Sequence, residues 1–416
     1  MKKKTLAMLS LLCAFVLMVA ACSPAATPGE NGNQGGQSSG APQGSGDEGE
    51  AASGEPLIIG GSIGVTGPFG FAGTGTKKGY DLKIKEVNAA GGIDGRPVEL
   101  VSYDDEGNPE KAVQNAQRLM KSDNAVAIIG YIAGRTAAAV QSVADDNQFV
   151  IFTSTGGYVG KNYMFSNTPY IAYETEIISQ WLQMKGIKKV GYIATSDTSG
   201  DAVVGYIEQN LKGKDGIEYA IERFGIQDID VTPQLTRLRG QGIEALVVVG
   251  LGAAATVPIQ NATQLGFDMP ILTTHANMST AFAQSIKDFM PEQMFVSGPA
   301  FLAPEEMSDE NPLKQPALEF TQKFEQEYGA KPDYPLNALG YDAMGMLLEA
   351  IRLADSTDGT AIKEALENNF KEFQGVAGVY TYTPEDHRGI QTEGQGIMRL
   401  DKDLTWHIEW EPEFWK

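Results

Sequence analysis

Residues 86–105, EVNAAGGIDGRPVELVSYDD, continued by NPEKAV at 108–113, decide the fold class of this chain. The first residues end an amphipathic stretch, glycines interrupt it, and Val98–Tyr103 is a short run of strand type. Asn108 and Pro109 then begin a new helix, because asparagine caps helix N-termini and proline suits the first helical turn. A helix, a strand and a helix in close succession predict one unit of a parallel α/β sheet.

The same alternation continues outward in both directions from this stretch. The predicted strands are Leu57–Ile63, Val98–Tyr103, Ala125–Ile129, Phe149–Thr153, Lys189–Ala194, Tyr219–Phe224, Ala245–Val249 and Pro270–Thr273. The helices predicted between them include Lys77–Asn88, Pro109–Lys121, Thr136–Asp145, Glu174–Lys185 and Ala253–Leu265. Longer helices follow at Gln315–Tyr328, Leu336–Ala354 and Thr360–Asn369, and then a strand-like segment at Val376–Thr381. The pattern predicts two βα blocks, at about 57–170 and 171–296.

The composition excludes several classes of protein. A length of 416 residues predicts two or three domains, and 42% hydrophobic residues exclude wholesale disorder. A net charge of −21 argues against a general nucleic-acid binder, which needs a basic face. Only 2 Cys and 3 His argue against a disulfide scaffold and a multi-ligand zinc site.

The N-terminus predicts a lipoprotein signal peptide at residues 1–21. Three lysines precede an apolar run that is short for a membrane-spanning helix, although a permanent anchor helix is the alternative. The run ends in Val19-Ala20-Ala21-Cys22, which resembles the bacterial lipobox. This resemblance implies that Cys13 leaves with the signal peptide and that Cys22 is lipidated, attaching the chain to the cell membrane.

Residues 22–56 predict a disordered tether after this anchor. The segment after Cys22 is rich in glycine and proline and has no aromatic residue, Ile, Leu, Val or Met, so it cannot bury apolar surface. It carries five acids and no base. Removing these acids and the three N-terminal lysines from the total leaves −19 on residues 57–416, so the folded body is itself acidic.

Two motifs suggest enzymes, but both lack essential parts. Gly250–Ala255 (GLGAAA) follows a strand as a dinucleotide fingerprint does, yet no acid stands at the end of the next strand. Gly60–Gly64 (GGSIG) matches a nucleophile elbow, yet it leads into Val65-Thr66-Gly67-Pro68 rather than into a helix. We therefore expect no catalytic site, no cofactor and no metal, and a hydrolase remains a distant alternative.

Polar loops at strand ends predict a ligand site instead. In open α/β sheets, ligands bind beyond the carboxyl ends of the strands, and helix N-termini there favour anions such as carboxylates. The relevant loops are Thr66-Gly67-Pro68-Phe69, Tyr131-Ile132-Ala133-Gly134-Arg135-Thr136 and Ser154-Thr155-Gly156-Gly157-Tyr158.

The opening stretch is also similar to a family motif, the xINAAGGxxGxxxxLxxxDDxxxPxxAV run of the branched-chain amino-acid-type periplasmic binding proteins. Thr66-Gly67-Pro68 and Ala127–Gly130 fit the family as well, and the resemblance covers about 57–410. It implies a type I fold: two doubly wound, Rossmann-like α/β lobes joined by a three-stranded hinge and closing on a ligand. The expected crossovers lie near Pro169–Ile171, Val296–Ser297 and Gln374–Val376. The expected lobes are 57–170 plus 297–374, and 171–296 plus 375–416.

The resemblance also implies ligand contacts at particular positions. In the first lobe, the serine that grips the ligand's carboxylate falls on Gly134, next to Arg135 and Thr136. The family's pair of a small residue and a threonine falls on Thr155 and Gly157, next to Ser154. Two second-lobe tyrosines and the glutamate that receives the α-ammonium fall on Ser199, Leu251 and His275. Neutral histidine is a poor substitute for a carboxylate, and Asp197 or Asp201 are candidates to replace it.

The function implied is the extracytoplasmic solute-binding subunit of an ABC importer, without enzymatic activity. The subunit would be monomeric and lipid-anchored, and would deliver a small polar solute, by default an amino acid, to membrane permease subunits. One alternative ligand is a carboxylate or aromatic compound without an ammonium, held by Arg135, the Ser154–Thr155 loop and the rings of Tyr131, Tyr158 and Tyr170. A sensory ligand-binding receptor is the alternative of a different class.

Overall fold

A computed structural model describes residues 54–390 and 392–414 of the chain. The predicted signal peptide, the lipidation site Cys22 and nearly all of the tether lie outside these residues. Within the described part of the chain, no helix combines the length and the hydropathy that crossing a membrane requires.

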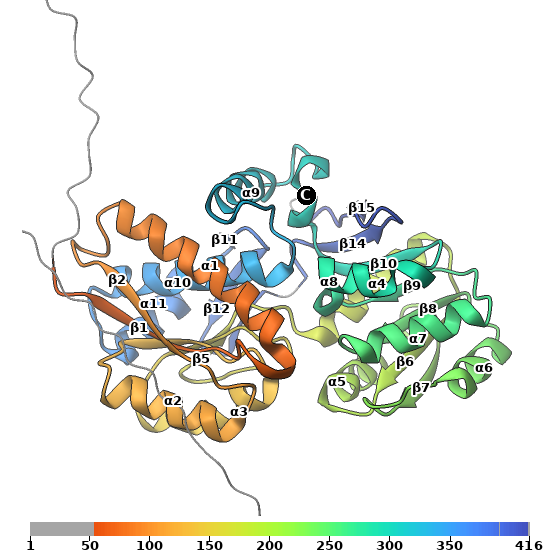
Figure 1. Ribbon diagram of the computed structural model, residues 1–416, viewed down its shortest axis with the longest axis horizontal. Coiled ribbons are helices and arrows are strands. Elements are labelled where there is room, and N and C mark those ends of the chain that lie inside the picture. The colour runs from red at the N-terminus through yellow and green to blue at the C-terminus, as the bar shows by residue number, and fades with distance from the viewer. Residues whose placement is uncertain (1–53, 391, 415–416) are drawn as a thin grey trace, which may run out of the picture. The chain divides into compact units, whose positions relative to one another are not determined.

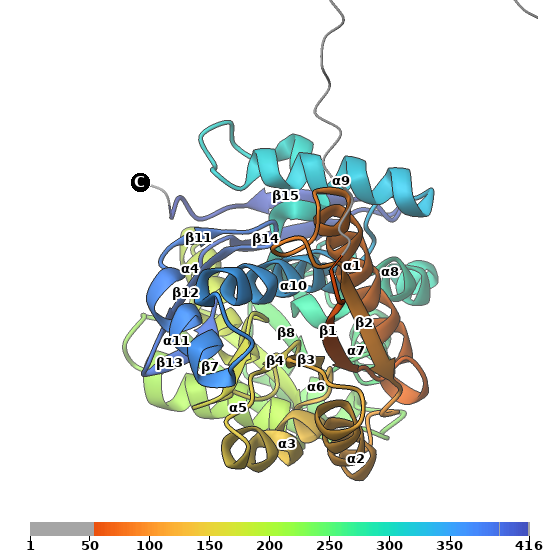
Figure 2. The ribbon, with the colours of Figure 1, turned by 90° about the vertical axis from the view of Figure 1, so that its left-hand side faces the viewer.

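The first lobe is built on a five-stranded parallel sheet. Its strands are β1 (Leu57–Ser62), β2 (Val98–Tyr103), β3 (Ala127–Gly130), β4 (Ile151–Thr153) and β5 (Met164–Ser166), in the order β2-β1-β3-β4-β5. Helices α1 (Gly70–Ala89), α10 (Pro335–Ala354) and α11 (Gly359–Asn369) lie over one face, and α2 (Pro109–Lys121) and α3 (Gly134–Asp146) over the other (Figures 1 and 2). Ile129 packs with the first set of helices and Ile128 with the second, so β3 is buried on both faces.

The second lobe repeats this order and adds two antiparallel strands. Its sheet contains β6 (Lys189–Thr195), β7 (Glu218–Phe224), β8 (Ala245–Val249), β9 (Ile271–Thr273), β10 (Met294–Pro299), β14 (Gln395–Leu400) and β15 (Trp406–Trp410). The order β7-β6-β8-β9-β10 matches that of the first lobe, with β14 and β15 continuing beyond β10. The helices are α4 (Ile171–Met184), α5 (Thr198–Tyr206), α6 (Thr232–Gly240), α7 (Ala253–Gln264) and α8 (Thr280–Ile286). Two doubly wound lobes, as the resemblance implies, are therefore confirmed.

The remaining elements are short, apart from one long helix. Helix α9 (Lys314–Tyr328) precedes α10, and a small antiparallel sheet contains β11 (Phe373–Gln374), β12 (Val379–Thr383) and β13 (Asp386–Gly389). The 3-10 turns are η1 (Gly67–Phe69), η3 (His275–Asn277), η4 (Lys287–Phe289), η5 (Ala300–Leu302) and η6 (Pro304–Glu306), and η2 (Ile207–Leu211) is a π-helical turn.

Two of the expected crossovers lie elsewhere in the structure. Strand β10 continues through Val296–Ser297 to Pro299 within the second sheet. The third crossover falls after β13 rather than at Gln374–Val376, because β12 and β13 pack against β5. His387 Nδ1 donates to the Met164 carbonyl at 3.2 Å, and the Tyr382 hydroxyl donates to the Ser166 carbonyl at 3.1 Å. The first lobe therefore extends to Gly389, and the expected boundary at 374/375 is wrong.

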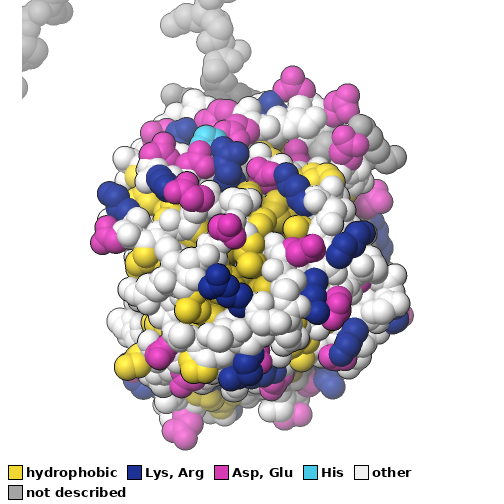
Figure 3. All heavy atoms as spheres, turned by 90° about the vertical axis from the view of Figure 1, so that its right-hand side faces the viewer, with side chains coloured by type: hydrophobic (Ala, Val, Ile, Leu, Met, Phe, Trp, Pro, Cys, Tyr) yellow, Lys and Arg dark blue, Asp and Glu magenta, His cyan; other side chains and the backbone are white. Residues whose placement is uncertain are grey.

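One surface view illustrates the charge pattern. On the face at the right of Figure 1, acidic and basic side chains are interspersed with apolar ones (Figure 3). The described residues form no continuous basic patch on this face, the feature by which nucleic-acid binders are recognised.

Candidate functional site

The strand-end loops of the first lobe lie side by side at the carboxyl edge of its sheet. Tyr131 N donates to the Ser62 carbonyl and Ser154 N to the Gly130 carbonyl, each at 2.8 Å. The loop after β3 also touches the loop after β4, since a Cβ added at Gly134 would come within 2.8 Å of the Gly157 carbonyl oxygen. This close approach explains why glycine occupies position 134, where the resemblance implies a serine.

The N-terminus of α3 offers free donors at this edge. The backbone N–H groups of Gly134 and Arg135 donate to no acceptor in the described chain, as expected for a first helical turn. Together with the helix dipole, such groups favour a carboxylate. The exposed Arg135 side chain donates through Nε to the Gly107 carbonyl at 2.7 Å and lies 5.5 Å from the Phe69 ring centroid.

Thr66 and Phe69 lie next to this edge in the β1–α1 loop. The exposed Thr66 hydroxyl donates to Asp104 Oδ2 at 2.5 Å, and Val65 N donates to the other carboxylate oxygen at 3.1 Å. Asp104 follows β2, so its carboxylate fixes one strand-end loop against the next. The first two loops predicted for the site meet through the Arg135 guanidinium, which lies over the Phe69 ring.

The loop after β4 has hydroxyl groups that already have partners. The Ser154 hydroxyl is 2.6 Å from the hydroxyl of Tyr80, and Thr155 Oγ1 accepts from Gly157 N at 3.1 Å. The Tyr158 hydroxyl donates to Gln141 Oε1 at 3.1 Å, and its side chain is partly exposed. These bonds order the loop at the edge where the resemblance places ligand contacts.

Two expected contact residues are fully buried. Tyr131 is fully buried in the cluster between the sheet and the α2–α3 layer, so its ring supports the loop from beneath. Thr136 is also fully buried and donates its hydroxyl to the Ala133 carbonyl at 2.8 Å, within the first turn of α3. Both side chains are buried in this structure, and their role as ligand contacts stays a prediction.

In the second lobe, the acids that could have replaced a missing carboxylate are engaged. Asp197 caps α5 by accepting from Gly200 N at 3.0 Å and from the Thr195 hydroxyl at 2.8 Å. Asp201 pairs with Arg223 at 2.6 Å. Ser199 lies in the first turn of α5, and Leu251 is half-buried after β8. Both residues therefore lie next to the ends of second-lobe strands.

His275, at the end of β9, belongs to a buried cluster with Glu174. His275 Nδ1 is 2.5 Å from Glu174 Oε1, and His275 N donates to Glu174 Oε2 at 2.9 Å. The Ser297 hydroxyl donates to Glu174 Oε2 as well. The His275 ring also meets the first lobe, because a Cβ at Gly156 would lie 3.6 Å from His275 Cε1.

Sequence reasoning missed Glu174 and Ser297. The only signal was an acid within the apolar stretch Ile171–Leu182, and an acid in a first helical turn is ordinarily explained by the helix dipole. The members of this buried cluster come from α4, the end of β9 and β10, which are far apart along the chain. No short sequence motif therefore contains them together.

Tyr170 belongs to a group of aromatic rings, of which only Tyr170 itself was named from the sequence. Its ring packs edge-on to Tyr173 at 5.6 Å between centroids, and Tyr173 packs in the same way on Tyr206 at 5.5 Å. The Arg388 guanidinium lies 4.9 Å from the Tyr173 ring centroid. Tyr170 is the N-cap residue of α4 and Arg388 is on β13, so this group spans two chain segments that lead from one lobe into the other.

The serine of the elbow-like motif and the three histidines are hydrogen-bonded to acids and not to one another. The Ser62 hydroxyl donates to Asp105 Oδ2 at 3.0 Å rather than to a histidine. The three histidines pair elsewhere: His275 with Glu174, His387 with Glu367, and His407 with Glu306. Across the described ranges, no group of three or more His, Cys, Asp or Glu side chains is arranged to hold a metal ion.

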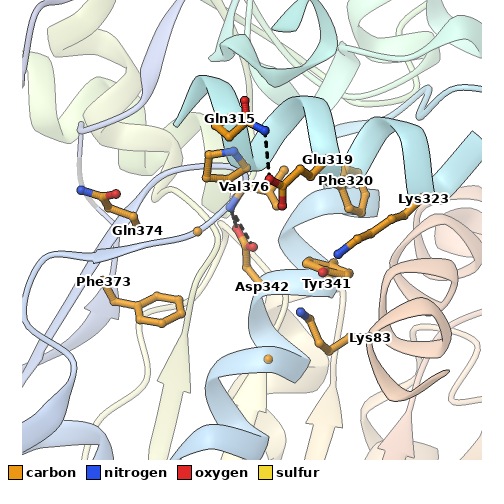
Figure 4. A pocket seen from close by; sticks show the side chains of 13 residues that line it. Lys83, Gln315, Glu319, Phe320, Lys323, Tyr341, Asp342, Phe373, Gln374 and Val376 are labelled. Carbon is orange, nitrogen blue, oxygen red and sulfur yellow. Dashed lines mark hydrogen bonds between the residues drawn. The ribbon is translucent and has the colours of Figure 1, made fainter. Parts of the chain in front are cut away.

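Two cavities have defined walls, and the second of them borders the β1–α1 loop through Val65 and Gly70. One of about 240 Å³ lies among α1, α9, α10 and β11, and its wall includes Lys83, Lys323, Tyr341 and Asp342 (Figure 4). Another, of about 290 Å³, lies where α1 meets the start of α8, beside Phe71 and Tyr334. Neither contains a residue that the sequence placed in the site.

The relatives found by comparison with known proteins have names of one kind, those of amino-acid-binding proteins. An "Amino acid binding protein" of Pseudomonas aeruginosa is 27% identical over 214 residues, which cover 49% of this chain and 57% of that protein. "Leu/Ile/Val-binding protein homolog 7" of Brucella abortus is 22% identical, covering 76% of this chain and 82% of the relative. These relatives are binding proteins rather than enzymes, which confirms that prediction.

A solved structure shares the fold. The branched-chain amino acid transporter substrate-binding protein of Streptococcus pneumoniae, in complex with isoleucine, superposes with a TM-score of 0.72 at 22% identity, covering 86% of this chain and all of that one. The family model described as "Periplasmic binding protein" matches residues 56–402. With two doubly wound lobes and polar loops at their strand ends, this chain therefore belongs to the periplasmic binding protein family, with the type I fold and an extracytoplasmic location.

Proposed function

We propose that this chain is the solute-binding subunit of an ABC importer and delivers a small carboxylate-bearing solute, by default an amino acid, to membrane permease subunits. The observation that carries the proposal is the N-terminus of α3, where the N–H groups of Gly134 and Arg135 are free beside three ordered strand-end loops. A carboxylate at this edge would satisfy these donors and interact favourably with the helix dipole.

The second lobe supports the proposal through its own strand ends. A Cβ added at Gly156 would lie 3.6 Å from His275 Cε1, so groups from both lobes are close enough to contact one small solute. A solute that contacts both lobes favours the closed arrangement over the open one, which gives a permease a form to recognise. The isoleucine-bound relative with the same fold is consistent with this scheme.

Calorimetry on the purified full chain tests the proposal. We expect saturable binding of at least one compound from a panel of amino acids and of simple aliphatic and aromatic acids. If no member of the panel binds, the proposal is wrong. If a member binds, but deletion of the gene for this chain leaves uptake of that compound unchanged and abolishes a signalling response to it, the sensory receptor becomes the better assignment.

The anchor belongs to the same proposal. We propose that Cys22, outside the described residues, carries lipid and tethers the body to the cell membrane through residues 23–56. Labelling with radioactive palmitate should mark the wild-type chain and not Cys22→Ala. Equal labelling of both chains would rule out this attachment.

A further inference from the structure

The second-lobe edge of the site presents a buried histidine with one ring nitrogen free. Nδ1 of His275 is committed to Glu174 at 2.5 Å, and Nε2 has no hydrogen-bond partner in the described part of the chain. Only 8% of this side chain is exposed. An unpartnered polar atom in such a position, at the carboxyl end of a sheet strand, points to a ligand.

The charge of Glu174 determines the state of this ring. Its side chain is 2% exposed and accepts from His275 N, from the His275 ring and from the Ser297 hydroxyl, so both carboxylate oxygens are occupied. A buried carboxylate needs a compensating charge, and His275 is the only basic side chain in ion-pair contact with it among the described residues. Burial by itself lowers the pKa of His275, but Glu174 outweighs that effect and holds the pKa above its usual value.

A protonated ring turns Nε2 into a donor. With Nδ1–H directed to Glu174, the remaining N–H can only donate, because an imidazolium has no free lone pair. The neighbouring acids do not change this, since Asp197 caps α5 and Asp201 pairs with Arg223. This edge therefore offers a cationic donor to a solute and no free carboxylate for an ammonium.

We propose that the solute is a small carboxylate without an ammonium group, and that His275, oriented by Glu174, donates Nε2–H to one of its oxygen atoms. The inference rests on the proposed function and specifies its solute class. An α-ammonium brought near the imidazolium would be repelled, and the neighbouring carboxylates of Asp197 and Asp201 already have partners. An acid oxygen would gain a charge-assisted hydrogen bond.

Matched ligand pairs test the solute class. L-Leucine and 4-methylpentanoate share one carbon skeleton and differ by the ammonium, as do L-phenylalanine and 3-phenylpropanoate. Calorimetry on the full chain should show an acid of one pair binding at least tenfold more tightly than its amino acid. An amino acid that binds as tightly as its acid overturns the inference and leaves the proposed function intact. Absence of binding by all four compounds and by the wider panel overturns both.

Variants test the role of His275. His275→Gln removes the positive charge, so the preferred acid should bind about ten- to hundredfold more weakly, as for the loss of a hydrogen bond to a charged group. Since this change leaves Glu174 uncompensated, the pair Glu174→Gln/His275→Gln provides a second variant without a buried charge. His407→Gln, at a partly exposed histidine that pairs with Glu306, is the matched control and should leave affinity unchanged. Wild-type affinity in both His275 variants contradicts the proposal.

Nitrogen-15 NMR of the histidine rings gives a reading that does not depend on the variants being folded. At pH 7, the wild-type His275 ring should be protonated on both nitrogens, and the Nε2 proton should shift when the acid is added. A neutral ring with an unprotonated Nε2 would make this nitrogen an acceptor and overturn the inference.

Discussion

At the scale of single residues, Asp342 shows how burial and hydrogen bonding oppose each other. This residue of α10 is buried and accepts from Val376 N and Ala377 N at 2.9 Å and from the Tyr380 hydroxyl at 2.8 Å. Its carboxylate joins α10 to the segment that leads into β12 (Figure 4). Burial raises the pKa of Asp342 to about 6, although the three donors and Lys83 act in the opposite direction.

This pKa predicts an unusual pH dependence of stability. Because the folded state holds the proton of Asp342 more tightly than the unfolded state does, this residue's contribution is fully present below pH 4 and is lost as the pH rises through about 6. Over this window the loss amounts to about 3 kcal/mol, at 1.36 kcal/mol per pKa unit. Urea unfolding of wild type and Asp342→Asn at pH 5 and pH 7 measures it.

The comparison of the two proteins isolates Asp342 from the other carboxylates. Relative to Asp342→Asn, the wild type should be more stable at pH 5 than at pH 7, since asparagine keeps an acceptor oxygen but does not titrate. A stability difference that is the same at both pH values would show that the hydrogen bonds, rather than burial, determine the ionisation of Asp342.

At the scale of elements, the crossing of α1 and α10 depends on glycine. A Cβ at Gly79 would come within 2.2 Å of the Asn337 carbonyl oxygen, and one at Gly340 within 2.4 Å of the Thr76 carbonyl oxygen. Both obstacles are backbone atoms, which cannot move aside as a flexible side chain can. The two helices therefore cross at a distance that only these glycines permit.

Gly79→Ala should accordingly destabilise the protein by about 3 kcal/mol or more, at or above the upper end of the usual cost of overpacking. Gly205→Ala is the matched control, because Gly205 lies in helix α5 with nothing within 4 Å of an added Cβ. The control should stabilise the protein by up to about 1 kcal/mol through helix propensity. Free energies of unfolding in urea measure both changes, and a cost below 1 kcal/mol for Gly79→Ala would refute the close crossing.

The same glycines explain which elements were predictable from the sequence. Buried strands such as Ala245–Val249 were located correctly because their apolar runs are continuous. Helix α1 was predicted to begin at Lys77 but begins at Gly70, since its early glycines signalled a loop. A Cβ at Gly73 would lie 2.1 Å from the Gly64 carbonyl, so tertiary packing, which a local pattern does not contain, determines this turn.

At the scale of the whole molecule, the loops of the candidate site were predictable and its chemistry was not. Parallel strands place their carboxyl ends at one edge, so the loops at 131–136 and 154–158 could be brought together from the sequence. The partners of His275 could not, because Glu174 lies 101 residues away along the chain and Ser297 lies on another strand. The burial of the Tyr131 ring could not be predicted either, because a ring after a strand can point to solvent or into the core, and only packing decides.

Hydrogen exchange tests whether one solute engages both lobes. Ligand at about 100 times its Kd adds about 2.7 kcal/mol to the free energy of unfolding, so amides that exchange by global unfolding should slow about a hundredfold in both lobes. Amides at the site should gain protection locally as well, at Gly134 and Arg135 in the first lobe and at His275–Asn277 in the second. The tightest-binding acid from calorimetry is the probe, and the exposed segment 226–230 serves as the internal reference. Local protection confined to one lobe would place the site within that lobe, and the closing of two lobes on a shared solute would then be excluded.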